Sequence, residues 1–238
     1  CNELTEQGFH AQIQQEPQIA GGNIIKRRHW RVWEEETLPP CIMVIQSIDT
    51  AFEPDEVNDC SARTTWGIFE HEEQPDPNLP WRGPRQKRLC AILIERFNDR
   101  VEYPELRKLT IEGAAKYQPD RILIEKKASG HSLIQELKRA DLPVVAVKPL
   151  DSKVARAHAA SLLFERGCVF YIKRNWSEEV IAQCSEFPTG EHDDLVDTVT
   201  QAILYVRRRW HLDLTDDAED DEDELDLMDY TRRRKIYG

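Results

Sequence analysis

The sequence lacks several features that would assign a protein to a class at once. It has six cysteines, but no two of them form a CxxC pair, so neither a zinc site nor a disulfide framework is indicated. We expect reduced, mostly buried thiols. No run of about eighteen apolar residues is present, and no secretory signal peptide is recognisable. The sequence therefore predicts a protein that is not secreted and has no membrane partner.

An excess of positive charge is missing as well. The formal net charge of -12 argues against a general nucleic-acid coat. Acidic residues crowd positions 216–229, and a short basic run follows at 232–235. Because such charge density leaves few apolar residues to bury, we predict that residues 212–238 form a disordered tail. No GxxxxGK[ST] phosphate loop occurs, so ATPase activity is not expected of this chain.

Hydrophobic periodicity predicts one α/β domain over residues 39–211. Residues 1–38 are mostly polar and are predicted to form a linker or N-terminal arm. Three strands come first in the domain, which favours an antiparallel meander, and helices and strands alternate after them, which favours a mixed sheet flanked by helices. Strands are expected at 41–49, 64–70, 89–97, 121–128, 142–149 and 169–173, and helices at 103–118, 129–140, 152–167, 177–187 and 193–209.

The stretch GEHDDLVDTVTQAIL (190–204) places three aspartates at the start of an otherwise apolar helix. One or two acids there are explained by capping and by the helix dipole. Asp197 shares a helical face with both Asp193 and Asp194, and like charges on one turn cost free energy unless a cation binds. The pattern therefore predicts a metal site with further ligands elsewhere in the chain.

Two more acids end apolar runs that are predicted to be buried strands. Asp49 follows CIMVIQSI, and Glu125 follows RILI. Each alone is explained by a salt bridge at a strand end, but together with the acidic helix they suggest a cluster of carboxylates. Mg²⁺ prefers such oxygen ligands, and two ions roughly 4 Å apart promote phosphodiester cleavage. Asp49, on a central strand, is the expected ligand shared by both ions.

Acids in the order strand, strand, helix resemble the RNase H-like nuclease superfamily. VIQSIDTAF (44–52), LIEKKASGHSLIQEL (123–137) and HDDLVDTVTQAI (192–203) are similar to the three acidic motifs of tailed-phage large terminases, and segment 9–33 is similar to their interdomain linker. The resemblance implies an RNase H-like mixed sheet, an antiparallel meander followed by parallel strands, flanked by helices. It also implies a metal-dependent endonuclease that cuts concatemeric double-stranded DNA with two Mg²⁺ or Mn²⁺ ions.

Site residues follow from the same resemblance. Asp49, Glu125, Asp194 and Asp197 match the catalytic acids, and Asp193 is a further metal ligand. Six basic residues are candidates for DNA binding, the last four in the proline-rich loop 71–88, which we expect near the acids: Lys126, Lys127, Arg82, Arg85, Lys87 and Arg88. The portal protein and the small terminase subunit are expected partners through a longer parent protein, in the host cytoplasm at the procapsid portal.

Two alternatives remain open. A junction resolvase or transposase of the same superfamily would share the acids but would not explain the linker. A non-catalytic DNA clamp or portal-docking module would use the acids to bind a structural ion or merely to cap a helix.

Overall fold

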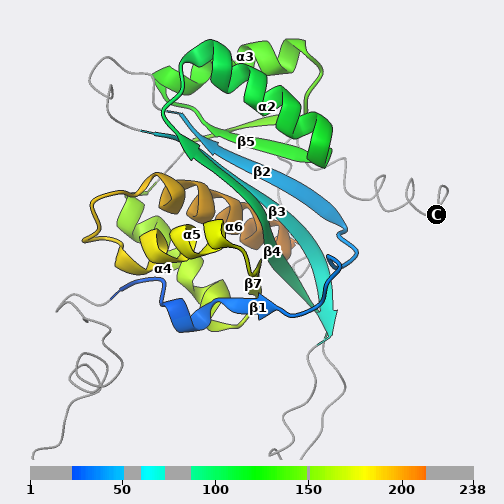
Figure 1. The fold of residues 1–238 in the computed structure, drawn as a ribbon, viewed down its shortest axis with the longest axis vertical. Coiled ribbons are helices and arrows are strands. Elements are labelled where there is room, and N and C mark those ends of the chain that lie inside the picture. Colours follow the sequence, from blue (N-terminus) through cyan, green and yellow to red (C-terminus); the bar gives the residue numbers. More distant parts are fainter. Residues whose placement is uncertain (1–22, 51–59, 73–86, 149–150, 213–238) are drawn as a thin grey trace, which may run out of the picture.

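A computed structural model describes residues 23–50, 60–72, 87–148 and 151–212. Its centre is a seven-stranded sheet with the strand order β1-β7-β4-β3-β2-β5-β6 (Figure 1). The strands are β1 Arg31–Trp33, β2 Met43–Asp49, β3 Ser61–Glu72, β4 Lys87–Asp99, β5 Arg121–Glu125, β6 Val144–Val147 and β7 Val169–Ile172. The helices are η1 Arg27–His29, α2 Tyr103–Tyr117, α3 Ala128–Arg139, α4 Lys153–Glu165, α5 Asn175–Glu186 and α6 Asp194–Leu212.

The strand directions agree with the predicted mixed sheet. β3 runs antiparallel to both of its neighbours, β2 and β4, and so forms the meander. Every other neighbouring pair is parallel: β2 with β5, β5 with β6, β4 with β7, and β7 with β1. Each parallel crossover within residues 121–172 passes through a helix, as parallel pairing requires. The predicted fold class is confirmed.

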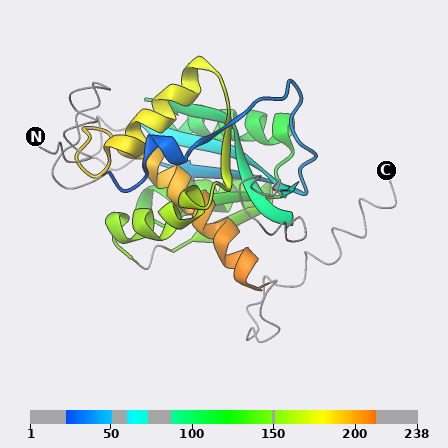
Figure 2. The ribbon, with the colours of Figure 1, turned by 90° about the horizontal axis from the view of Figure 1, so that it is seen from below.

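Helices cover the two faces of the sheet unequally. Helices α4, α5 and α6 pack on one face, and α2 and α3 pack on the opposite face over β2, β5 and β6 (Figure 1). Figure 2 shows α6 between α4 and α5. Successive strand residues serve the two faces in turn. Ile45 and Leu123 belong to the core beneath α6, whereas Ile48 and Ile124 belong to the core beneath α2 and α3.

Part of the predicted N-terminal arm packs on the domain. β1 pairs in parallel with β7 at one edge of the sheet, and Ile25 and Trp30 are buried in the core beneath α4 and α6. A three-residue strand has no periodicity of its own, so the sequence could not reveal it. The predicted tail beyond residue 212 and most of loop 71–88 lie outside the described residues.

Smaller features of the described residues complete the fold. Gly167 follows α4 with a φ of +67°, the left-handed conformation that glycine supplies after a helix end. None of the five described cysteines forms a disulfide, and Cys90, Cys168 and Cys184 are buried. None of the described helices has the length and apolar character needed to cross a bilayer.

Candidate active site

Two of the predicted acids meet at one edge of the sheet. Asp49 is the last residue of β2 and Glu125 is the last residue of β5. These strands are parallel, with Ile48 opposite Ile124, so the next residue of each strand brings the two carboxylates side by side. Because side chains alternate along a strand, both acids point to the face that α6 covers.

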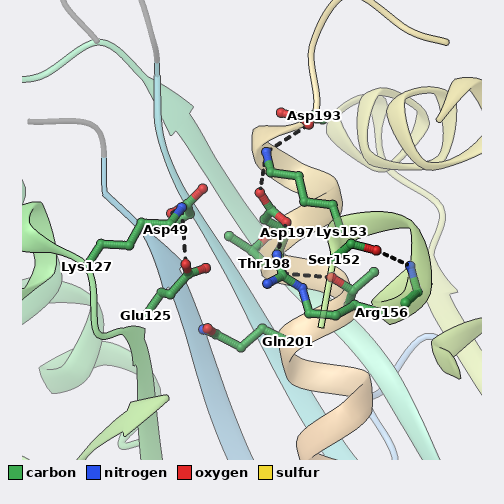
Figure 3. Close-up of polar contacts among 12 residues, drawn as sticks. Asp49, Glu125, Lys127, Ser152, Lys153, Arg156, Asp193, Asp197, Thr198 and Gln201 are labelled. Carbon is green, nitrogen blue, oxygen red and sulfur yellow. Dashed lines mark hydrogen bonds and ion pairs between the residues drawn. The ribbon is translucent and has the colours of Figure 1, made fainter. Parts of the chain in front are cut away.

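Helix α6 brings a third acid to this pair. Asp197 lies in its first turn and is 5 % exposed. One turn further along, Gln201 donates from Nε2 to Oγ of Ser47 at 2.9 Å and to the backbone oxygen of Leu123 at 3.2 Å. These two hydrogen bonds fasten α6 to β2 and β5 next to the strand ends. Figure 3 shows Asp197 facing the Asp49 and Glu125 pair, with Gln201 beside them.

A lysine bridges the two strand acids. Nζ of Lys127 lies 3.3 Å from Oε1 of Glu125 and 3.6 Å from Oδ1 of Asp49. Lys127 precedes α3, and its side chain is 35 % exposed. The ammonium therefore partly neutralises both carboxylates while remaining open to solvent.

A second lysine bridges two acids at the start of α6, Asp193 just before the helix and Asp197 in its first turn. Nζ of Lys153 lies 2.8 Å from Oδ2 of Asp193 and 2.8 Å from Oδ2 of Asp197, but only the contact to Asp193 is a well-directed hydrogen bond. Arg156, one turn along α4, donates from Nη2 to Oδ1 of Asp197 at 2.7 Å. Asp197 is therefore held between two cations (Figure 3).

Negative charge is not fully balanced around Asp49. Burial raises the pKa of Asp49 from its ordinary value of 3.8 to about 7, and the carboxylates of Asp197 and Glu125 also raise it, against the opposing effect of Lys127 and Lys153. A buried carboxyl beside other carboxylates is characteristic of functional sites. The arrangement favours the binding of a further cation.

The donor atoms suit a hard divalent cation. The acids gathered from β2, β5 and α6 supply carboxylate oxygens, the ligands that Mg²⁺ prefers. Among the residues described, no three Asp, Glu, His or Cys side chains surround a common point as closely as metal ligands do. Lys127 and Lys153 instead bridge the carboxylates in pairs. The residues fit such an ion in kind, and the two ammonium groups occupy the positions between the carboxylates.

The remaining predicted acids lie at the start of α6. Asp193 precedes the helix, and its backbone oxygen accepts the first helical hydrogen bond, from Asp197 at 3.1 Å. Asp194 is the first helical residue and is half-buried. Asp193 is thus at the N-cap position of α6, and its side chain also accepts a hydrogen bond from Lys153.

The basic candidates are divided between the two ends of the sheet. Lys126 is exposed beside Lys127 at the acidic edge. Lys87 and Arg88 lie elsewhere: they pair with Glu72 and His71 at the end of β3, whereas Asp49 pairs with Ala62 near its beginning. About ten residues of extended strand separate these positions, on the order of 30 Å. The expected closeness of Lys87 and Arg88 to the acids is therefore wrong. Arg82 and Arg85 lie outside the described residues.

Three residues of the site were not predicted from the sequence: Lys153, Arg156 and Gln201. A lysine and an arginine on a surface helix are ordinary features. The signal lay in the topology: β6 is parallel to β5, so the helix after β6 must begin at the edge where β5 ends. That reasoning would have brought the start of α4 to the acids.

Comparison with known proteins yields one family. The family model of the terminase RNase H-like domain matches residues 87–206, about half of the 238 residues. The match includes Glu125, Asp194 and Asp197, and it begins after Asp49, which the fold brings beside Glu125. No curated protein matches the sequence.

Solved structures with a similar fold include terminase structures from two thermophilic phages. The large terminase of phage D6E with ADP aligns with a TM-score of 0.55 at 11 % identity, over 78 % of this chain and 45 % of its own. The large terminase nuclease of phage G20c with bound cobalt aligns with a TM-score of 0.52 at 13 % identity, over 78 % of this chain and 98 % of its own. The aligned part of this chain thus covers nearly all of the G20c nuclease and less than half of the D6E protein.

Proposed function

The chain belongs to the family of terminase RNase H-like domains, and from that premise we propose that it is the metal-dependent endonuclease of a viral DNA-packaging terminase. Its substrate is concatemeric double-stranded DNA, which it cuts into packageable lengths. The observation that carries the proposal is the meeting of Asp49, Glu125 and Asp197 at the ends of β2 and β5 and the start of α6. The family favours this function over that of a resolvase or transposase.

Two Mg²⁺ or Mn²⁺ ions at this site would activate a water molecule and stabilise the leaving oxygen of a phosphodiester. Asp49, whose carboxyl feels both Glu125 and Asp197, would be the ligand shared by the ions. Glu125 and Asp197 would each hold one ion, and Arg156 would orient Asp197 through its Oδ1. Asp194 would be the further ligand from α6. Asp49 must lose its proton before it binds, and no covalent enzyme intermediate is needed.

The way in which DNA is recognised follows from the same residues. Lys126 and Lys127 flank the acids and are suited to contact the phosphate backbone, which carries no base sequence. We expect cutting with little sequence preference. Lys87 and Arg88 are candidates for a more distant contact along the duplex, and Arg82 and Arg85 stay candidates for DNA binding.

Packaging itself requires parts that this domain does not supply. The D6E large terminase is more than twice as long as the region that this chain matches. We propose that a longer parent protein provides the ATPase motor and the contacts with the portal protein and the small terminase subunit. The domain then acts in the host cytoplasm, at the portal of the procapsid.

A second candidate function is that of a DNA clamp or portal-docking module without catalysis. It is favoured by one observation, the internal cations that already accompany Asp49, Glu125 and Asp197. A clamp would bind DNA without cutting it, and its binding would not depend on Asp49.

Nicking of supercoiled plasmid separates these two functions. The chain is incubated with Mg²⁺, with Mn²⁺ or with EDTA, and an Asp49→Ala variant of equal thermal stability is treated alongside. The nuclease predicts relaxed and linear products that require metal and disappear in the variant. Nicking that persists in EDTA or in the variant contradicts the proposal, and DNA binding without nicking by a metal-loaded protein supports the clamp.

A further inference from the structure

Two helices that are consecutive in the chain begin with a lysine at the acidic edge of the sheet. Lys127 is the N-cap of α3 and Lys153 is the first residue of α4. The helix dipole disfavours a cation at this end, and N-cap positions favour Ser, Thr, Asp or Asn. Neither helix has an acidic residue in its first turn. Helix stability therefore does not account for either lysine.

Each of these lysines bridges its own pair of carboxylates. Lys127 joins Asp49 to Glu125, and Lys153 joins Asp193 to Asp197. Their side chains are 35 % and 44 % exposed, so solvent and substrate reach both ammonium groups. The position between two carboxylates is also the one that a divalent ion would take. Lysine and metal therefore compete for the same oxygens.

Arg156 differs from the two lysines. Its side chain is 14 % exposed and donates a directed hydrogen bond to Oδ1 of Asp197. Its planar guanidinium is bound more rigidly than an ammonium on a flexible four-carbon stem. Arg156 is therefore suited to stay in place and orient Asp197, whereas Lys127 and Lys153 are suited to move.

We propose that Lys127 and Lys153 are exchangeable counter-ions, which neutralise the carboxylates in the metal-free protein and move to the DNA phosphates when divalent ions take their place. The inference rests on the proposed function and adds two positioning residues to it. It makes metal binding and DNA binding reinforce each other, because each ion that enters releases a cation for the substrate. In the metal-free protein the same lysines weaken the attraction between the site and stray cations.

Metal affinity without DNA tests the first half of this exchange. Calorimetric titration with Mn²⁺ is carried out on the wild-type chain and on Lys153→Met. Removal of a unit positive charge a few ångströms from the ion should raise the affinity about tenfold. Lys138→Met is the matched control, because Lys138 is exposed at the far end of α3 and its loss changes the net charge equally. It should bind Mn²⁺ as the wild type does.

The salt dependence of DNA binding tests the second half. Anisotropy of a labelled duplex is measured over a series of NaCl concentrations, in EDTA and in Ca²⁺, with the integrity of the duplex checked on a gel. Each lysine that contacts a phosphate adds about 0.9 to the slope of log affinity against log salt. Lys153→Met should lower the slope by about this amount in Ca²⁺ and leave it unchanged in EDTA. Lys138→Met should follow the wild type in both.

Each outcome supports or overturns the proposed exchange of lysine for metal. Unchanged or weaker Mn²⁺ binding by Lys153→Met overturns the competition, and an unchanged slope in Ca²⁺ overturns the transfer to phosphate. If Lys153→Met fails to fold, Lys127→Met replaces it, because Asp197 then keeps both of its cations. If the wild type binds Mn²⁺ and nicks plasmid while Lys153→Met and Lys127→Met behave like the control Lys138→Met, only the exchange fails. If the wild type neither binds Mn²⁺ nor nicks, the proposed function fails with it.

Discussion

Two clusters of buried charge lie on opposite faces of the sheet and differ in how well their charges match. Beneath α2, Arg63 donates from Nη1 to the backbone oxygen of Leu109 at 2.8 Å and pairs through Nη2 with Glu95 at 3.3 Å. Beneath α6, by contrast, Asp49 adjoins two further carboxylates, and its pKa rises to about 7. Matched buried charges maintain a structure, whereas a surplus of one sign indicates a place where a ligand is missing.

The sharpest test of this contrast is Asp197→Asn. The change removes a proposed metal ligand. We therefore expect metal-dependent nicking to fall by at least about a hundredfold, the effect of removing one charge-stabilising group from an active site. It also leaves the buried Arg156 without its counter-charge, whereas Lys153 keeps Asp193, and stability should fall by about 3 kcal/mol. Plasmid nicking and thermal melting measure the two effects. A variant as stable as the wild type would show that Asp197 is not held as the structure describes.

Arg63→Met should destabilise the protein strongly without touching the metal site. It leaves the Leu109 carbonyl without the guanidinium donor and Glu95 without its cation, although Thr65 still donates to Glu95, and breaking a buried pair costs about 3–5 kcal/mol. Denaturant unfolding measures the loss, and the double variant Arg63→Met with Glu95→Leu should recover part of it. Mn²⁺ affinity of the folded variant should equal that of the wild type. A changed affinity would mean that the two clusters are coupled through the sheet.

A pH series on the metal-free protein tests the surplus charge at Asp49. Its folded pKa, about 7, lies above the ordinary value of 3.8, so the native state binds more protons than the unfolded state between these values. Stability should therefore fall as pH rises from about 4 to 7, by up to about 4 kcal/mol. The difference in melting temperature between wild type and Asp49→Asn in EDTA should grow in favour of the variant over this range. A difference independent of pH would contradict the raised pKa.

Predictions from the sequence were accurate where they depended on the residues of a single strand or helix. Apolar runs ending in Asp49 and Glu125 indicated two strands with their acids, and the predicted helices lie within a few residues of the observed ones. β1 was missed because a three-residue strand is defined by its pairing with β7, a long-range contact that local propensity does not record. Lys153 was missed for the same reason, since only the sheet order brings it to Asp197.

Two glycines permit a matched comparison of the clusters on a smaller scale. A Cβ on Gly130 would lie 2.4 Å from the backbone oxygen of Glu125, and a Cβ on Gly113 would lie 2.4 Å from Nη1 of Arg63. Both glycines are helical, so alanine gains about 1 kcal/mol of helix propensity in each case, against a steric cost of about 1–3 kcal/mol.

The two alanine variants should therefore differ in both stability and function, with the larger loss at Gly130, where the added Cβ would meet backbone rather than a side-chain end. Gly130→Ala displaces the backbone that positions Glu125, and a displacement of about 1 Å in a catalytic group lowers rates on the order of a hundredfold. Gly113→Ala displaces only Arg63, so its nicking rate and Mn²⁺ affinity should match the wild type. Melting temperature, nicking rate and Mn²⁺ titration of both variants provide the comparison. Equal activity in the two would mean that the carboxylate of Glu125 tolerates a shift of its backbone, and hence that the site is less rigid than its hydrogen bonds to α6 suggest.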